Sequence, residues 1–209
     1  MNDPNEHRGK VVLFEGMDGA GKSTLVKAVQ AAYEAKAYGV RVLPFPSHDG
    51  AVGNFIRSKI FTGEEVVDGK AMAPLMLADA IDCEGMMIEA RNECDVVLVD
   101  RHTIVSMWAY QLGHWPVAAV ARLGDPAWFE VLPDVVFILD VPAEVAVERM
   151  RARGGEVNPL YEKGTEYAEL LRERYACWAG LHATNAPVCI LDGTKATSTL
   201  VAEVLDVIS

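Results

Sequence analysis

Short apolar runs alternate along this chain with longer segments in which apolar and polar residues are mixed. The apolar runs cover residues 10–14, 40–45, 94–100, 133–141 and 186–192. They have the length of strands and are apolar nearly throughout, a pattern typical of strands that are buried on both faces of a parallel sheet. The chain is therefore expected to contain about five parallel strands.

The segments between these runs predict helices. Residues 22–39 place Leu25, Val29 and Ala32 on one helical face, and Gly39 supplies a stop signal. Further helices are predicted over residues 50–61, 71–93, 117–131, 143–153, 165–183 and 198–208. Irregular structure is expected near residues 44–52, 62–70, 111–126 and 154–165.

The alternation of strands and helices predicts an α/β fold in which helices cover both faces of the sheet. With 209 residues, the chain is expected to form a single domain, residues 1–209. Ligands of such sheets bind at the carboxyl ends of the strands. Glu15, Asp100 and Asp140 stand at such ends, which makes this edge the expected site.

The composition narrows the choice of partners. The formal net charge of −11 argues against a broad nucleic-acid or anionic-membrane surface, so an anionic ligand needs a local basic cluster. The polar N-terminus resembles no targeting peptide, and no apolar run has the roughly 20 residues of a membrane helix. A cytoplasmic protein with free thiols at its four cysteines is therefore expected.

The loop "GMDGAGKST", residues 16–24, matches the pattern GxxxxGK[ST] between a strand and a helix. Backbone N–H groups of such a loop converge on phosphate oxygens, its lysine bridges the outer phosphates, and its serine holds magnesium. The alternative is a chance glycine turn before a helix. The loop predicts an ATP site with Mg²⁺ at Gly16, Asp18, Gly19, Ala20, Gly21, Lys22, Ser23 and Thr24.

Asp100, which follows the apolar residues 96–99, is the expected second magnesium ligand beside Ser23. Asp140 competes for this role, but no basic residue adjoins it; a helix cap is the plain alternative for Asp100. Arg101 is expected to neutralise charge between donor and acceptor phosphates, against the alternative of a surface ion pair.

Arginines also precede the diglycine at residues 154–155. Arg149, Arg151 and Arg153 lie on a predicted helix before this hinge, as expected of a closing lid over approximately residues 149–164. A solvated basic helix end is the alternative for at least one of them. Arg153, nearest the hinge, is the preferred catalytic candidate, and Arg149 is assigned to the ATP side.

Four segments together resemble thymidylate kinases: "FEGMDGAGKST", "VDRHTIVSMWAYQ", "DVVFILDVPAEVAVERMRARGG" and "LYEKGTEYAELLRERY". Their order and approximate spacing are similar to that family over nearly the whole chain. The resemblance implies a three-layer P-loop NTPase fold with a five-stranded parallel sheet and a lid. It also implies an ATP:dTMP phosphotransferase that uses Mg²⁺ and forms a homodimer.

The resemblance also implies ligand-binding roles for those residues of this chain that match the family's motifs. Lys22, Arg101 and Arg57 would hold phosphates, and Asp18 would meet the deoxyribose 3′-hydroxyl. The arginine-rich lid and the absence of an arginine beside Asp18 are similar to the bacterial subtype. The acceptor side would comprise Asp18, Phe45, Arg57, Leu77, Ile81, Arg101, Ser106, Tyr110, Gln111 and Tyr161.

The departures from the family concentrate at the base. The family's aromatic residue that stacks on thymine, and the arginine four residues later, are replaced by Leu77 and Ile81. The acceptor is therefore expected to be dTMP or a modified pyrimidine nucleotide. Two alternatives stay open: a kinase for a hydroxymethylated pyrimidine, free or in DNA, and a non-catalytic nucleotide-binding or switch protein.

Overall fold

A parallel β-sheet forms the centre of the protein, as the apolar runs predict. The computed structural model describes residues 8–152, 164–181 and 186–208. All strand pairs are parallel, and the strand order is β2-β3-β1-β4-β5. The strands are β1 (Lys10–Glu15), β2 (Val40–Pro44), β3 (Val96–Asp100), β4 (Val135–Asp140) and β5 (Val188–Asp192).

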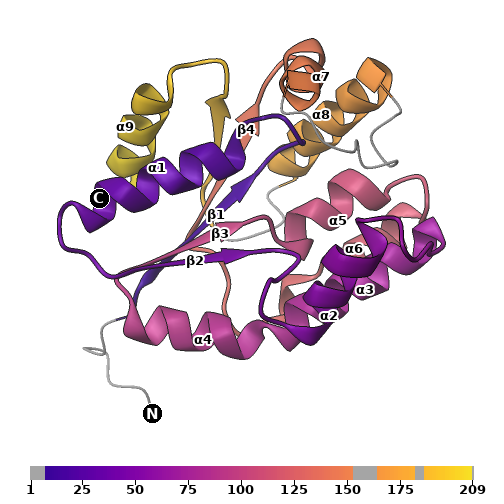
Figure 1. Ribbon diagram of the computed structural model, residues 1–209, viewed down its shortest axis with the longest axis horizontal. Coiled ribbons are helices and arrows are strands. Elements are labelled where there is room, and N and C mark those ends of the chain that lie inside the picture. The colour runs from indigo at the N-terminus through magenta and orange to yellow at the C-terminus, as the bar shows by residue number, and fades with distance from the viewer. Residues whose placement is uncertain (1–7, 153–163, 182–185, 209) are drawn as a thin grey trace.

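Helices cover both faces of this sheet, giving the three layers of an α/β fold (Figure 1). Helices α1 and α9 pack together on one face, and α4 lies on the other. The helices are α1 (Lys22–Glu34), α2 (Ala51–Phe55), α3 (Gly69–Asp82), α4 (Glu84–Glu93), α5 (Thr103–Gln111), α6 (Val117–Leu123), α7 (Ala143–Ala152), α8 (Gly164–Gly180) and α9 (Thr197–Ile208), with a π-helical turn η1 (Ile56–Ile60) and a 3₁₀ turn η2 (Pro126–Trp128).

Three helical predictions need correction. The single helix predicted over residues 71–93 is two helices, α3 and α4, separated at Cys83, whose backbone lies at φ −94° and ψ 0°. The helix predicted over residues 117–131 ends at Leu123, before a glycine and a proline-started 3₁₀ turn. Helix α5 was not predicted, because most of its residues are buried and it lacks the polar stripe of a surface helix.

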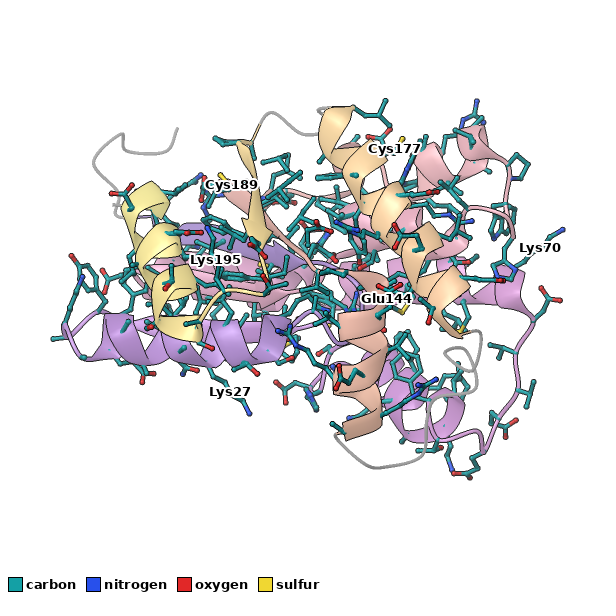
Figure 2. All side chains as sticks on the ribbon, turned by 90° about the horizontal axis from the view of Figure 1, so that it is seen from above. Lys27, Lys70, Glu144, Cys177, Cys189 and Lys195 are labelled. Carbon is teal, nitrogen blue, oxygen red and sulfur yellow. The ribbon has the colours of Figure 1, made fainter. Side chains whose placement is uncertain are left out.

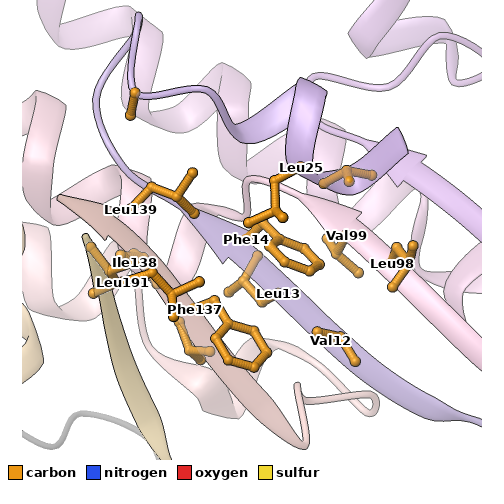
Figure 3. Close-up of a cluster of buried hydrophobic side chains, with 14 of the residues drawn as sticks. Val12, Leu13, Phe14, Leu25, Leu98, Val99, Phe137, Ile138, Leu139 and Leu191 are labelled. Atoms are coloured by element: carbon orange, nitrogen blue, oxygen red, sulfur yellow. The ribbon is translucent and has the colours of Figure 1, made fainter. Parts of the chain in front are cut away.

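The core is built around the middle of the sheet. Leu13 of β1 lies between Val99 of β3 and Val136 of β4 in the strand register. The rings of Phe14 and Phe137 stack with centroids 5.5 Å apart (Figure 3). The carboxyl end of β1 is thereby held in a close-packed surrounding, and the loop that follows it starts from a fixed point.

The four cysteines are free thiols, as expected. Cys177 lies on α8 and Cys189 on β5, on separate elements (Figure 2). Across the described residues, we find no helix with both the length and the apolar character needed to cross a membrane.

Truncation of Phe137 tests the importance of this core. Phe137 is fully buried, so Phe137→Ala leaves a cavity and should lower the free energy of unfolding by about 3–5 kcal/mol. Urea unfolding followed by circular dichroism measures the change. Val66 is 91% exposed, and Val66→Ala should change the same quantity by less than about 0.5 kcal/mol. Equal effects of the two substitutions would contradict this description of the core.

Candidate active site

A cavity of about 270 Å³ opens at the carboxyl ends of β1, β2 and β3. Its walls come from the glycine-rich loop, the end of β2, the turn η1, and helices α3, α5 and α8. In Figure 1 the arrow of β2 points toward the group formed by α2, α3 and α5. The cavity therefore occupies the edge of the sheet at which the sequence predicts the site.

The glycine-rich loop takes a conformation that only glycine adopts without strain. Gly16, Gly19 and Gly21 have φ values of 136°, 81° and 104°. A Cβ atom on Gly19 would lie 2.3 Å from the carbonyl oxygen of Ala146 on α7. The loop is thus wrapped closely against α7 and delivers Lys22 to the first turn of α1.

Lys22 folds back over this loop. Its ammonium group donates to the carbonyl oxygens of Gly16 (2.9 Å) and Met17 (3.0 Å), and its side chain is buried. Burial lowers the pKa of Lys22 to about 8, and the nearby charge of Arg101 adds to this effect. A buried cation in a loop of converging N–H groups is suited to hold a polyanion.

Ser23 and Asp100 meet as predicted, since the hydroxyl of Ser23 donates to a carboxylate oxygen of Asp100 at 2.8 Å. Asp140 instead accepts two hydrogen bonds from Arg172 of α8, at 2.7 and 2.9 Å. Among the described residues, no cluster of three or more His, Cys, Asp or Glu side chains could hold a metal. A hydroxyl and one carboxylate fit Mg²⁺, which takes few protein ligands and completes its shell with phosphates and water.

Arg101 connects the loop with the neighbouring helices. Its backbone has a positive φ of 73°, which is uncommon for a side-chain-bearing residue. Its guanidinium group pairs with the Asp18 carboxylate, donates to the Tyr175 hydroxyl at 3.1 Å, and lies 5.2 Å from the centre of the Tyr110 ring. The Tyr110 hydroxyl donates to the other Asp18 oxygen at 3.2 Å.

A fully buried carboxylate, that of Glu15, lies beneath Arg101. It accepts hydrogen bonds from the His102 backbone N–H (2.8 Å), the Ser106 hydroxyl (2.8 Å) and the Tyr175 hydroxyl (3.0 Å). The Arg101 guanidinium lies 3.8 Å away. Burial raises the pKa of Glu15, while Arg101 and the hydrogen bonds oppose this rise. The sequence placed Glu15 at a strand end but did not predict this role.

His102 fixes the start of α5. Its Nδ1 accepts the backbone N–H of Ile104 at 3.3 Å, and its ring makes edge-on contacts with the rings of Phe45 and Phe129. Burial lowers the pKa of His102 to about 4, so the ring is neutral near pH 7. This neutral ring keeps Nδ1 free to accept the bond that caps the helix.

Arg57 reaches the cavity from the π-helical turn η1. Its Nε donates to the carbonyl oxygen of Pro46 at 2.5 Å. The loop at Pro46 is itself anchored, because the backbone N–H of Ser47 donates at 2.9 Å to Asp79, a buried carboxylate of α3. The structure therefore holds Arg57 against the cavity through two neighbouring elements.

The α3 wall differs from the sequence-based expectation. Leu77 is buried in a cluster with Met107 and Val120, and Ile81 is 45% exposed; neither lines the cavity. Met72 and Met76 line it instead. Successive residues of a helix point about 100° apart, so a shift of one residue moves a side chain from the wall into the core.

The comparisons with known proteins agree with this geometry. Residues 14–204 match the family described as thymidylate kinase. The chain belongs to this family. A probable thymidylate kinase of Thermococcus kodakarensis is 33% identical over 177 residues, which cover 78% of this chain and 81% of that protein.

Two bacterial relatives extend the comparison. The thymidylate kinase of Thermosipho africanus is 28% identical over 201 residues, covering 94% of this chain and 96% of that protein. The thymidylate kinase of Akkermansia muciniphila is 34% identical over 155 residues, covering 74% and 73%. The chain is therefore a phosphotransferase of the kind that phosphorylates nucleoside monophosphates.

Most of the expected site residues of this kinase lie around the cavity. Those that line it are Asp18, Gly19, Gly21, Lys22, Ser23, Phe45, Arg57, Asp100, Arg101, Ser106, Tyr110 and Gln111. Gly16, Ala20 and Thr24 belong to the loop without lining the cavity. Arg149 donates to the carbonyl oxygens of Ala20 and Gly193 at the back of the loop. Arg153 and Tyr161 lie outside the described residues.

Other residues line the kinase cavity without having been predicted, among them Phe61, Gly69, Met72, Met76, Thr103, Met107, His114 and Tyr167. The spacing of Thr103, Ser106, Met107, Tyr110 and Gln111 marks one face of a helix and would have indicated this wall if α5 had been predicted. The residues on α3 and α8 carry no comparable signal.

The buried His102 predicts a pH dependence of stability. Its pKa of about 4 in the folded kinase lies below the ordinary value of 6.5, so between these values only the unfolded chain binds the proton. Stability should therefore fall as the pH drops from 6.5 toward 4, by about 1.4 kcal/mol for each pH unit. Between pH 7.5 and 5 the kinase should lose about 2 kcal/mol more than His102→Asn, which keeps a capping oxygen but does not titrate. Urea unfolding at both pH values measures this difference, and parallel losses in the two proteins would contradict it.

Proposed function

We propose that this kinase transfers the γ-phosphoryl group of ATP to a pyrimidine deoxynucleoside monophosphate, with dTMP as the principal acceptor and Mg²⁺ as the metal. The observation that carries the proposal is the position of Arg101. It joins the loop residue Asp18 to Tyr110 of α5, so one cation stands between the donor loop and the rest of the cavity.

The donor half consists of the loop with Lys22, Ser23 and Asp100. The loop N–H groups and Lys22 would hold the β- and γ-phosphates of ATP. Ser23 and Asp100 would hold Mg²⁺, which would neutralise part of the phosphate charge during transfer. Arg149 supports this half from behind through the Ala20 carbonyl.

The acceptor half consists of Arg57, Asp18 and the α3 and α5 walls. Arg57 would hold the monophosphate, because its guanidinium lines the cavity and is tied through Nε to Pro46. Asp18 would accept the deoxyribose 3′-hydroxyl, and the bonds from Arg101 and Tyr110 fix the position of its carboxylate. Tyr110 and Gln111, which line the same cavity, would stand on the base side.

In the transfer, an acceptor phosphate oxygen forms a bond to the γ-phosphorus while the bond from that phosphorus to the bridging oxygen breaks. ADP leaves with the electron pair, and the unprotonated acceptor phosphate requires no general base. Lys22 and Arg101 stabilise the charge that is shared between the two nucleotides. Arg153 of the proposed lid would add a further charge, and closure of the lid would exclude water.

The proposal includes a cytoplasmic homodimer that acts on free nucleotides. The net charge of −11 supports a small acceptor over a polymeric one, since a DNA substrate needs an extended basic surface. The dimer rests on the likeness to thymidylate kinases. Analytical ultracentrifugation at micromolar concentration should give a mass of two chains.

Loss of the loop lysine should abolish turnover. Lys22→Met removes the buried ammonium group, and kcat with ATP and dTMP should fall at least about 1000-fold. A coupled assay of ADP formation, with product analysis for dTDP, measures the effect. Lys27 is exposed on α1 (Figure 2), so Lys27→Met is a matched control that should keep the full rate. A Lys22→Met protein with an unchanged rate would refute the assignment.

Loss of Arg57 should weaken acceptor binding selectively. Arg57→Gln should raise the KM for dTMP about 10- to 100-fold and leave the KM for ATP within about twofold, because in this assignment the residue would contact only the acceptor phosphate. The exposed Arg41→Gln on β2 is the control for lost charge. An equal rise of both KM values would show that Arg57 does not belong to the acceptor side.

A further inference from the structure

Two buried polar atoms on the α5 wall have no hydrogen-bond partner among the described residues. They are the hydroxyl of Thr103 and the Oε1 atom of Gln111, and both residues line the cavity. Buried polar atoms in folded proteins are nearly always paired. Two unpaired groups beside one cavity therefore point to a ligand that carries hydrogen-bonding groups of its own.

Apolar, adaptable side chains lie beside these two polar groups. Met72 and Met76 of α3 and Met107 of α5 line the same cavity, and thioether side chains adjust to ligands of different shape. His114 adjoins this wall because Gly69 has no side chain: a Cβ atom there would lie 2.7 Å from the His114 ring.

The three basic side chains that line the cavity already bond to other groups of the protein. Lys22 bonds the loop carbonyls, Arg57 bonds Pro46, and Arg101 pairs with Asp18. No other lysine or arginine among the described residues lines the cavity. In the thymidylate kinase pattern, an arginine stands four residues after the side chain that stacks on the base. Four positions after Met76 this chain has Ala80, which is buried and has no polar group. A base bound in this cavity would therefore meet no arginine from α3.

The groups that remain can each act as donor or as acceptor. The Thr103 hydroxyl and the Gln111 amide both have this property, whereas arginine only donates. No hydrogen bond among the described residues orients the Gln111 amide, so either end can face a ligand. Its Nε2 can donate to a 4-oxo group, and after a half-turn of the amide its Oε1 can accept from a 4-amino group.

We propose that the acceptor site takes both 4-oxo and 4-amino pyrimidine deoxynucleoside monophosphates, namely dTMP, dUMP and dCMP. This inference rests on the proposed function. It concerns only the base, because the transfer is the same for each: an α-phosphate oxygen bonds to the γ-phosphorus of ATP, and ADP leaves with the electron pair of the broken bond.

The test compares kcat/KM for dTMP, dUMP and dCMP with the full-length protein, ATP and Mg²⁺. The values for dTMP and dCMP should lie within about 100-fold of each other, since a site that rejects a mismatched polar group discriminates 10⁴-fold or more. A dCMP value more than about 100-fold below that for dTMP overturns this inference and leaves the proposed function intact. No diphosphate product from any of the three overturns both.

A donor-only side chain introduced on the α3 wall should create selectivity. Met76→Arg should raise the dTMP to dCMP ratio of kcat/KM at least about 10-fold, because the guanidinium can pair with a 4-oxo group but not with an amine. Ala78→Arg adds the same charge on the exposed face of α3 and should keep the ratio and rate of the unmodified kinase. An unchanged ratio in Met76→Arg, with circular dichroism showing a folded protein, overturns the inference.

Gln111→Leu keeps the test decisive if Met76→Arg fails to fold. It removes the shared amide, so the KM values for dTMP and dCMP should rise by similar factors of about 10 while kcat changes less. A rise for only one of the two nucleotides, or a fall of kcat alone, contradicts the role assigned to Gln111.

Discussion

The site depends on one buried ion pair with its hydrogen bonds, that of Glu15 with Arg101. The Glu15 carboxylate has no contact with solvent, and removing such a charge from water costs several kcal/mol unless it is fully paired. Its donors are His102 and Ser106 at the start of α5 and Tyr175 of α8. One carboxylate at the end of β1 thereby fixes the positions of two helices that form the cavity walls.

The same arrangement accounts for the unusual backbone of Arg101. Its backbone N–H donates to the carbonyl oxygen of Phe14 at the end of the sheet. Its φ is positive, a conformation that costs on the order of 1–3 kcal/mol. The pairing with Asp18 and the packing over Tyr110 offset this cost. The result is a guanidinium group whose direction is set by the fold rather than by a flexible side chain, which favours charge stabilisation without reorganisation.

The sequence predicted those parts of the site that local pattern determines. Uniform apolar runs predicted the sheet, and the loop motif with a strand-end aspartate predicted the meeting of Ser23 and Asp100. The role of Glu15 was not predictable, because Tyr175 lies 160 residues away and only the tertiary fold brings the two together. The prediction of the α3 wall was wrong for a geometric reason. Met76 and Leu77 are neighbours in sequence, but their side chains point in different directions, and only Met76 lines the cavity.

The two ends of the cavity differ in how firmly their polar groups are held. At the end proposed to hold the phosphates, Lys22, Arg57 and Arg101 are each fixed by bonds to the backbone or to carboxylates. On the α5 wall, Gln111 and Thr103 include unpaired atoms, and Met72, Met76 and Met107 contribute apolar surface beside them. In the proposed transfer the reacting atoms all belong to phosphates, so this chemistry would not depend on which base is bound. No bond that we observe ties Met72 or Met76 of α3 to the Glu15–Arg101 pair. Substitutions on the α3 side of the cavity should therefore change selectivity while the transfer geometry stays intact.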